Sequence, residues 1–249
     1  MEECKFHFSI DDVLASLIEV TDKNIALKDS PFFRDLWLLF ERYGLKTGLY
    51  VFNNTWVDDQ HRSLSEVRSL RRELQDGWLF FGAHALDFDT APYDQNINKN
   101  ISVFESIYSE LDRIAGSHMC QSVRLHYHSE CYELVDFFKN WGVTELLTTD
   151  KPVGLHRFAP HLRAEILEKG IISYNGMNLR RSHMRIENLA NDATSPVDFI
   201  EKAKRTINEH KKLILYSHEY EHERQEVVAY LYKAMQWVHE DLNLISDHP

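Results

Sequence analysis

Short apolar runs alternate with longer amphipathic stretches from one end of the chain to the other. The short runs are rich in aromatic or β-branched side chains and have the length of buried strands. They are Lys5–Ile10, Lys46–Phe52, Trp78–Ala85, Ser122–His128, Glu145–Thr148, Gly170–Tyr174 and Leu213–Ser217. Strands alternating with helices over the whole length predict a parallel sheet covered by helices. Seven such units in 249 residues favour a closed α/β barrel over an open sheet.

The stretches between these runs carry signals of helix ends. Ser30 and Pro31 have the pattern of an N-cap followed by a first-turn proline, and Gly44 lies just past the end of that stretch. Ser63 and Glu66 form a capping-box pattern that predicts a helix over residues 67–74. Further helices are expected around residues 101–111, 129–142, 195–207 and 222–239.

One region departs from this alternation. Residues 175–188 have no apolar helical face, and Met184 to Glu187 alternate between apolar and polar side chains. This pattern predicts a β-excursion or hairpin near residues 171–190, within a single domain that spans residues 1–249.

Composition narrows the classes of function. The 39 acidic residues against 28 basic ones give a net charge of −11, which disfavours nucleic acid and anionic membranes as partners. No apolar run is long enough to span a bilayer. The three cysteines fit reduced thiols, and residues 1–8 lack a signal-peptide pattern. We therefore expect a cytoplasmic protein, whose oligomeric state the sequence leaves open.

Two carboxylates end the first predicted strand. In a parallel barrel the carboxyl ends of the strands hold the chemistry. The first strand runs into Asp11 and Asp12, and two adjacent carboxylates cannot both be buried cheaply as ions. Either they serve as a general base and a metal ligand, or they are a helix N-cap and its neighbour.

Histidine and arginine follow other strands. His84 ends the third strand, where it is either a ligand of a divalent transition metal or a hydrogen-bonded structural residue. Arg124, His126 and His128 share one face of a strand with a period of two. If that face lines the barrel, Arg124 needs an anionic partner, for which a carboxylate of the first strand is the candidate. Otherwise the face is an outward polar stripe.

A further histidine ends the last strand. His218 titrates near neutral pH and could act as a general acid at the mouth of the barrel, or it could cap the final helix. Glu219 could orient this histidine or bind a metal. Trp56, in the loop after the second strand, either packs structurally or stacks on a substrate.

Three motifs, in their order along the chain, resemble those of polysaccharide deacetylases, the NodB-homology or carbohydrate esterase 4 superfamily. Residues 9–13, Ser-Ile-Asp-Asp-Val, resemble its T-F-D-D-G motif. Residues 124–127, Arg-Leu-His-Tyr, are similar to its R-P-P-Y segment, and residues 213–218 are similar to its closing L-x-H motif. The resemblance spans residues 5–219 and implies a distorted (β/α)7 barrel that removes acetyl groups from sugars.

The resemblance also implies roles for individual residues. Asp11 would be the general base, and Arg124 would hold it ionised and oriented. Asp12 would bind a zinc or similar divalent ion that polarises the acetyl carbonyl and activates water. The backbone N–H of Tyr127 would help to bind the oxyanion, and His218 would protonate the leaving group.

The family's metal motif is altered in this chain. Two histidines four residues apart are expected. His84 fills the first place, but Phe88 stands in the second, and Val13 replaces the usual glycine of the first motif. The candidates for a third ligand are Asp87, Asp89, His126 and Glu219. We choose Asp89, so that the predicted metal ligands are Asp12, His84 and Asp89.

Three functions are compatible with these patterns. The leading one is a metal-dependent hydrolase that removes an acetyl or other acyl group from a sugar or polysaccharide. The alternatives are a non-catalytic carbohydrate-binding or regulatory relative on the same barrel, and a barrel hydrolase of a small amide. The third metal ligand and the shape of the barrel mouth distinguish them.

Overall fold

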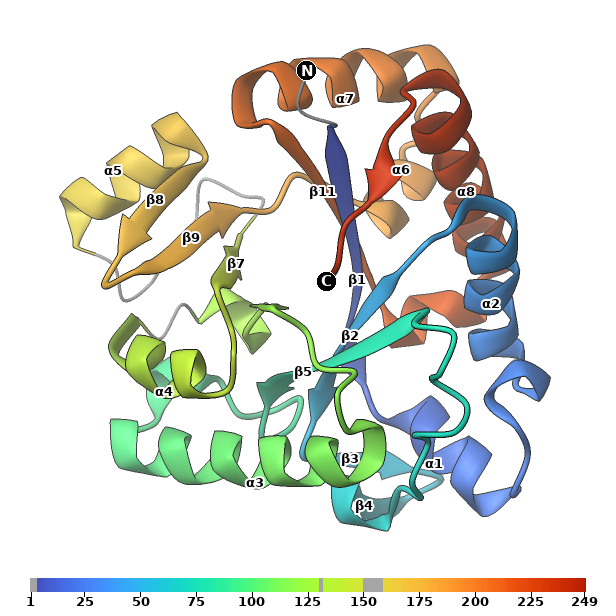
Figure 1. Cartoon of the computed structure of the whole chain (residues 1–249), viewed down its shortest axis with the longest axis vertical. Coiled ribbons are helices and arrows are strands. Elements are labelled where there is room, and N and C mark those ends of the chain that lie inside the picture. The colour runs from blue at the N-terminus through green and yellow to red at the C-terminus, as the bar shows by residue number, and fades with distance from the viewer. Residues whose placement is uncertain (1–3, 130–131, 150–158) are drawn as a thin grey trace.

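Parallel strands surrounded by helices form the centre of the protein (Figure 1). The computed structural model describes residues 4–129, 132–149 and 159–249. The barrel strands are β1 (Lys5–Val13), β2 (Thr47–Phe52), β5 (Leu79–Ala85), β6 (Ser122–Val123), β7 (Glu145–Thr148), β9 (Met177–Arg181), β10 (Met184–Arg185) and β11 (Lys212–His218). The helices are α1 (Ala15–Asp22), α2 (Pro31–Tyr43), α3 (Ile97–Ala115), α4 (Val135–Asn140), α5 (Pro160–Lys169), α6 (Ile186–Asn191), α7 (Pro196–His210) and α8 (Gln225–Gln236).

The strand ladder closes through two irregular junctions. One sheet has the order β10-β11-β1-β2-β5, and another contains β6, β7 and β9, with all of these neighbours parallel. A parallel bridge between Phe81 and Met119 joins β5 to the segment before β6. At the other junction, the Ser182 N–H donates to the carbonyl of Thr148, the last residue of β7, and the His183 N–H donates to a carbonyl of β11. The segment from Met177 to Arg185 therefore acts as one bent strand, and the predicted distorted (β/α)7 barrel is confirmed.

The region near residues 171–190 contains a hairpin, but its two strands have different places. β8 (Ile171–Tyr174) pairs antiparallel with β9 across Asn175 and Gly176, whose φ angles of 48° and 76° suit a tight two-residue turn. The run over Gly170–Tyr174 was expected in the barrel, yet β9 occupies that place and β8 lies outside it. The alternation at Met184 ends after β10, because α6 begins at Ile186.

The helix signals are realised unevenly. α2 begins at Pro31 and ends before Gly44, which has a φ of 65°. The capping box at Ser63 forms, but it caps a single 3₁₀ turn (Leu64–Glu66), and the helix predicted over 67–74 is absent from these described residues. The cause is tertiary: the Leu70 N–H donates to the carbonyl of Ile114 on α3, 2.8 Å away, instead of to its own chain segment.

The C-terminal tail closes the end of the barrel where the strands begin. β12 (Ile245–Ser246) pairs with the first residues of β1. The Gln121 N–H donates to the carbonyl of Pro249 at 2.7 Å, and Figure 1 shows the C-terminus in the middle of the strands. A site open to solvent must therefore lie at the opposite end, where the strands finish. Among the described residues, no helix combines the length and apolar character needed to cross a bilayer.

Candidate functional site

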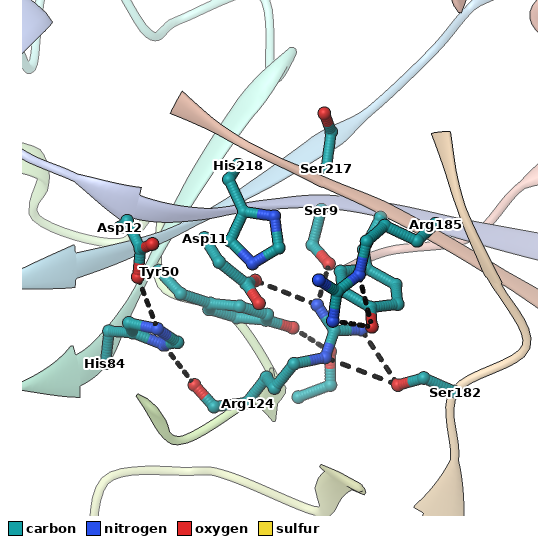
Figure 2. Close-up of polar contacts among 12 residues, drawn as sticks. Ser9, Asp11, Asp12, Tyr50, His84, Arg124, Ser182, Arg185, Ser217 and His218 are labelled. Atoms are coloured by element: carbon teal, nitrogen blue, oxygen red, sulfur yellow. Dashed lines mark hydrogen bonds and ion pairs between the residues drawn. The ribbon is translucent and has the colours of Figure 1, made fainter. Parts of the chain in front are cut away.

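The two adjacent aspartates diverge because the backbone turns between them. The register of β1 against β2 shifts between Ile10 and Val13, and Asp12 has a left-handed φ of 63°. Asp11 stays in register with His218 of β11. Figure 2 shows His218 beside Asp11, while Asp12 points to His84 at the end of β5. One strand end thus supplies carboxylates to two different groups of side chains.

Asp12 faces two imidazole rings. Its Oδ1 atom lies 3.0 Å from Nε2 of His84 and 3.2 Å from Nδ1 of His126, and these two nitrogens are 3.2 Å apart. All three residues are at least nine-tenths buried. Burial alone would raise the pKa of Asp12, but hydrogen bonds from His126 and His84, donated when their inward nitrogens carry a proton, outweigh burial and hold the pKa well below the usual range. Asp12 is therefore a carboxylate.

Backbone carbonyls fix both rings from behind. Nδ1 of His84 lies 2.6 Å from the carbonyl oxygen of Arg124, and Nε2 of His126 lies 2.9 Å from that of Phe88. A carbonyl can only accept, so each of these nitrogens donates outward and, when the ring is neutral, the inward nitrogen keeps a lone pair. Two lone pairs and a carboxylate oxygen repel one another at such distances unless a cation or proton lies between them. The arrangement fits a divalent transition metal, with a fourth position left for water or substrate.

The third member of this group is His126 and not Asp89. Asp89 is an exposed residue and does not belong to the cluster of Asp12, His84 and His126, which is the set of described residues with metal-ligand geometry. Phe88 contributes its carbonyl to orient His126, although its ring cannot bind a metal. His126 was among the sequence candidates but was not chosen, although the strand face that it shares with Arg124 was a signal that could have selected it.

Glu219 has a structural contact instead of a catalytic one. Its carboxylate accepts the backbone N–H groups of Leu14, Ala15 and Ser16, at 3.1, 3.0 and 2.7 Å, and so caps α1. Burial raises the pKa of Glu219, against the lowering effect of these hydrogen bonds. It touches neither His218 nor the metal cluster through any hydrogen bond or ion pair recorded for the described residues.

Arg124 is completely buried and is neutralised by Asp11. Its Nη1 donates to Asp11 Oδ1 at 2.8 Å and to Ser9 Oγ at 3.0 Å, and its other nitrogens reach Ser182 Oγ at 3.0 and 3.3 Å (Figure 2). The guanidinium also lies 4.0 Å from the ring centroid of Tyr216. These contacts hold one carboxylate oxygen of Asp11 in a fixed position beside His218.

His218 is held by a residue that the sequence analysis missed. Its Nδ1 lies 2.5 Å from Oε1 of the buried Glu187, whose other oxygen accepts from Ser217 at 3.0 Å. Burial alone would lower the pKa of His218, but the hydrogen bond to Glu187 and the charge of Asp11 outweigh it and raise the pKa. The alternation around Glu187 resembled a strand, so nothing in the sequence marked it.

The segment after β6 is more sharply turned than predicted. The strand stops at Val123, and Tyr127 and His128 both have left-handed φ angles, of 54° and 49°. Arg124 and His126 still point into the barrel, whereas the Tyr127 side chain is half exposed. The turn brings the Tyr127 ring to 4.1 Å from the His126 ring, centroid to centroid, so its backbone lies beside the metal cluster.

A cavity of about 600 Å³ opens on one side of Asp12. Its walls come from the starts of α1 and α2, the hairpin of β3 (Asn54–Val57) and β4 (Gln60–Ser63), and the segments after β5 and β11. Trp56 lines this cavity with two thirds of its side-chain surface exposed. The group of Asp12, His84 and His126 thus has an open approach from solvent through this side.

Several solved structures with the same fold are carbohydrate esterases or deacetylases, and a 4-alpha-glucanotransferase from Thermococcus litoralis also shares it, with a TM-score of 0.54 and 12% identity over 99% of this chain and 39% of that one. A family 4 carbohydrate esterase from Streptomyces lividans in complex with acetate has a TM-score of 0.56 and 10% identity, over 97% of this chain and 91% of that one. A peptidoglycan N-acetylglucosamine deacetylase has a TM-score of 0.55 and 9% identity, over 99% and 86%. The resemblance found in the motifs is therefore confirmed at the level of the fold.

The same comparison includes a protein without native activity. A variant of a carbohydrate esterase family 4 pseudoenzyme, with restored enzymatic activity, has a TM-score of 0.53 and 9% identity, over 98% of this chain and 65% of that one. No protein-family model matches the chain, and no curated protein matches it by sequence. The fold is thus shared by active and inactive proteins, and the side chains of the site must carry the argument about function.

Proposed function

We propose that this protein is a metal-dependent hydrolase that removes an acetyl group from an amino sugar or acetylated polysaccharide. The observation that most supports this proposal is the group of Asp12, His84 and His126. With both rings neutral, the three atoms that face one another are all hydrogen-bond acceptors, and none of them is a donor. Beside it lie a buried carboxylate and a histidine with a raised pKa. A base, an acid and a cation site at one barrel end are the parts that acyl hydrolysis needs.

Asp12, His84 and His126 would hold the metal, with zinc as our choice. When bound there, such an ion polarises an acyl carbonyl and lowers the pKa of a coordinated water. The outward hydrogen bonds of both imidazoles select the neutral tautomer whose metal-facing nitrogen carries the lone pair. Asp12 adds one negative charge to a site otherwise made of neutral rings.

Asp11 serves as the general base in this proposal. Its Oδ1 is occupied by Arg124, which leaves Oδ2 to accept a proton from the attacking water. The guanidinium forms a buried ion pair with this carboxylate at 2.8 Å and limits its rotation. Ser9 and Ser182 accept from further donors of Arg124, so the pair is held from both sides.

His218 serves as the general acid. With Nδ1 held by Glu187, its Nε2–H is the proton donated to the leaving amine or alkoxide. The raised pKa keeps a larger fraction of His218 protonated at neutral pH. The backbone N–H of Tyr127, which has a left-handed φ and follows His126, would donate to the developing oxyanion.

The test is acetate release from N-acetylglucosamine oligomers and acetylated xylan, after removal of metal and titration with zinc, cobalt or nickel. The proposal expects turnover that needs about one equivalent of metal and is lost in Asp12→Ala. Metal binding without acetate release from any acetylated sugar would overturn the hydrolase assignment and favour a carbohydrate-binding relative.

A further inference from the structure

The charged side chains that line the cavity beside Asp12 are acidic. Its lining contains Asp12, Glu219 and five further carboxylates: Glu19, Asp35, Asp87, Asp89 and Glu223. No lysine or arginine lines it among the residues that the structure describes. Burial lowers the pKa of His222, in the same wall, to about 4, so this ring adds no positive charge at neutral pH. A ligand in this space meets a strongly negative potential.

Two of these carboxylates are uncommitted. Glu19 pairs with Lys23, Asp35 accepts from Tyr232, and Asp87 accepts from the backbone of Thr90. Among the described residues, neither Asp89 nor Glu223 has a side-chain partner in an ion pair or hydrogen bond, and both are exposed. They are therefore available to a ligand.

Aromatic faces complete the same walls. The exposed fractions of Trp56, Phe88 and Tyr220 are 66%, 52% and 51%, unusually large for such side chains, and all three line the cavity. Ring faces of this kind stack on the apolar face of a sugar and attract a cation at the same time. Carboxylates interleaved with aromatic faces favour a ligand that is both cyclic and positively charged.

The cavity is continuous with the metal cluster. Asp12 lines it, and Oδ1 of Asp12 is buried without a hydrogen-bond donor among the described residues. By contrast, Asp11, Arg124 and His218 do not line it. The cavity therefore lies to one side of the reacting group, where it would receive a neighbouring part of the substrate.

We propose that this cavity binds a sugar unit carrying a free ammonium group, adjacent to the unit whose acetyl group is removed. The preferred substrate is then a partly deacetylated amino-sugar oligomer, and oligomers with uronic acid or other anionic neighbours are rejected. This inference rests on the proposed deacetylation, because that reaction places the acetylated unit at Asp12 and the neighbouring unit in the cavity. A carboxylate-bearing neighbour would meet Asp89 and Glu223 with like charge.

Three disaccharides test this selectivity. Each has one N-acetylglucosamine unit, joined to glucosamine, to glucose or to glucuronic acid. We expect kcat/KM for acetate release to fall in that order, by roughly five- to tenfold per step at low salt. Added sodium chloride should compress the differences, because screening weakens exposed charges.

Charge removal in the wall supplies the matched variants. The double variant Asp89→Asn with Glu223→Gln should bring the ratio of the ammonium to the neutral substrate close to one. The control is Glu201→Gln, which removes one charge from the exposed surface of α7 outside the cavity and should keep the wild-type ratio.

The outcomes separate the two proposals. Equal kcat/KM for all three disaccharides, or fastest release from the glucuronic acid substrate, overturns the cationic subsite and leaves deacetylation intact. If no disaccharide releases acetate, the proposed reaction fails, and calorimetry with the same three sugars then decides the subsite alone. Tighter binding of the glucosamine disaccharide would support it, and equal affinity would overturn it.

Discussion

Asp11 and Asp12 are adjacent in sequence, but the left-handed φ angle of Asp12 gives their carboxylates different partners. The left-handed turn at Asp12 sends one carboxylate to the two histidines and leaves the other on Arg124. We expect Asp11→Asn to lower kcat by about 10²–10⁴-fold, the range for a lost general base. Metal affinity, measured by calorimetry, should stay within about threefold of wild type, because Asp11 makes no contact with His84 or His126 in the described structure. A large loss of metal would assign Asp11 to the ligand set instead.

The identity of the third ligand is a second question at the scale of single residues. His126→Ala should weaken metal binding by about 100-fold or more, since it removes one of three inward atoms. Asp89→Asn is the matched control and should change the affinity by less than about twofold, because Asp89 lies outside the cluster. The reverse ranking would restore Asp89 as the ligand chosen from sequence.

The sequence predicted the contacts of single residues correctly where the residue type and the strand face were sufficient to determine them. Arg124 was expected to need a carboxylate from the first strand, and Asp11 lies 2.8 Å from it. His126 was only one of four candidates, because Phe88 broke the spacing of the family motif. Its selection depends on a carbonyl at Phe88 and on the turn at Tyr127, and side-chain identity encodes neither contact.

Among the secondary-structure elements, α1 depends on a cap from the other end of the chain. Three backbone N–H groups at its first turn donate to Glu219, more than two hundred residues away. Glu219→Gln replaces one acceptor oxygen with an NH₂ group that faces these donors. We expect a loss of about 1–3 kcal/mol in the free energy of unfolding by urea. Glu223→Gln, an exposed change in the same segment, should cost less than about 0.5 kcal/mol, and equal losses would deny Glu219 this role.

The contact between α6 and β11 controls the pH dependence of the proposed reaction. His218 acts while protonated, so activity falls as the pH rises through its pKa. Glu187 raises that pKa, after burial has lowered it. Glu187→Gln removes the negative charge and should move the alkaline limb of the kcat profile to lower pH, with the acid limb in place. Ser217→Ala removes a partner of Glu187 without changing charge and should leave the limb nearly unmoved. An unshifted limb in Glu187→Gln would mean that another group is the acid.

The elements themselves were predictable where local signals and tertiary context agree. The apolar faces of α2 and α3, with Pro31 and Gly44 at the two ends of α2, gave helices in the expected places, although the Ser30 side chain makes no capping hydrogen bond. The capping box at Ser63 gave only a 3₁₀ turn, since the Leu70 N–H bonds to α3. β8 is more apolar than β9, Ile-Ile-Ser-Tyr against Met-Asn-Leu-Arg-Arg, so the apolar pattern alone favoured the wrong strand as the partner of β7.

On the scale of the whole molecule, the C-terminal tail and the metal cluster close opposite ends of one barrel. The tail ties the starts of the strands together through β12 and Pro249. At the other end, Asp12, His84 and His126 come from the ends of β1 and β5 and from the turn after β6. A metal held by these three residues would link segments far apart in sequence, and only the folded chain brings them together.

Metal binding should therefore stabilise the entire fold. A ligand present at 100 times its Kd adds about 2.7 kcal/mol when only the folded state binds it. For a chain of this length each kcal/mol raises Tm by roughly 2–4 °C, so we expect an increase of roughly 5–10 °C with saturating zinc. Calorimetric melting should show this increase in the wild type and in Asp89→Asn, reversed by a chelator. The same zinc concentration should leave the Tm of Asp12→Ala unchanged, and the comparison is made within each variant because the substitution itself alters the metal-free Tm. A similar increase in Asp12→Ala would mean that zinc binds elsewhere, and the site at the strand ends would lose its support.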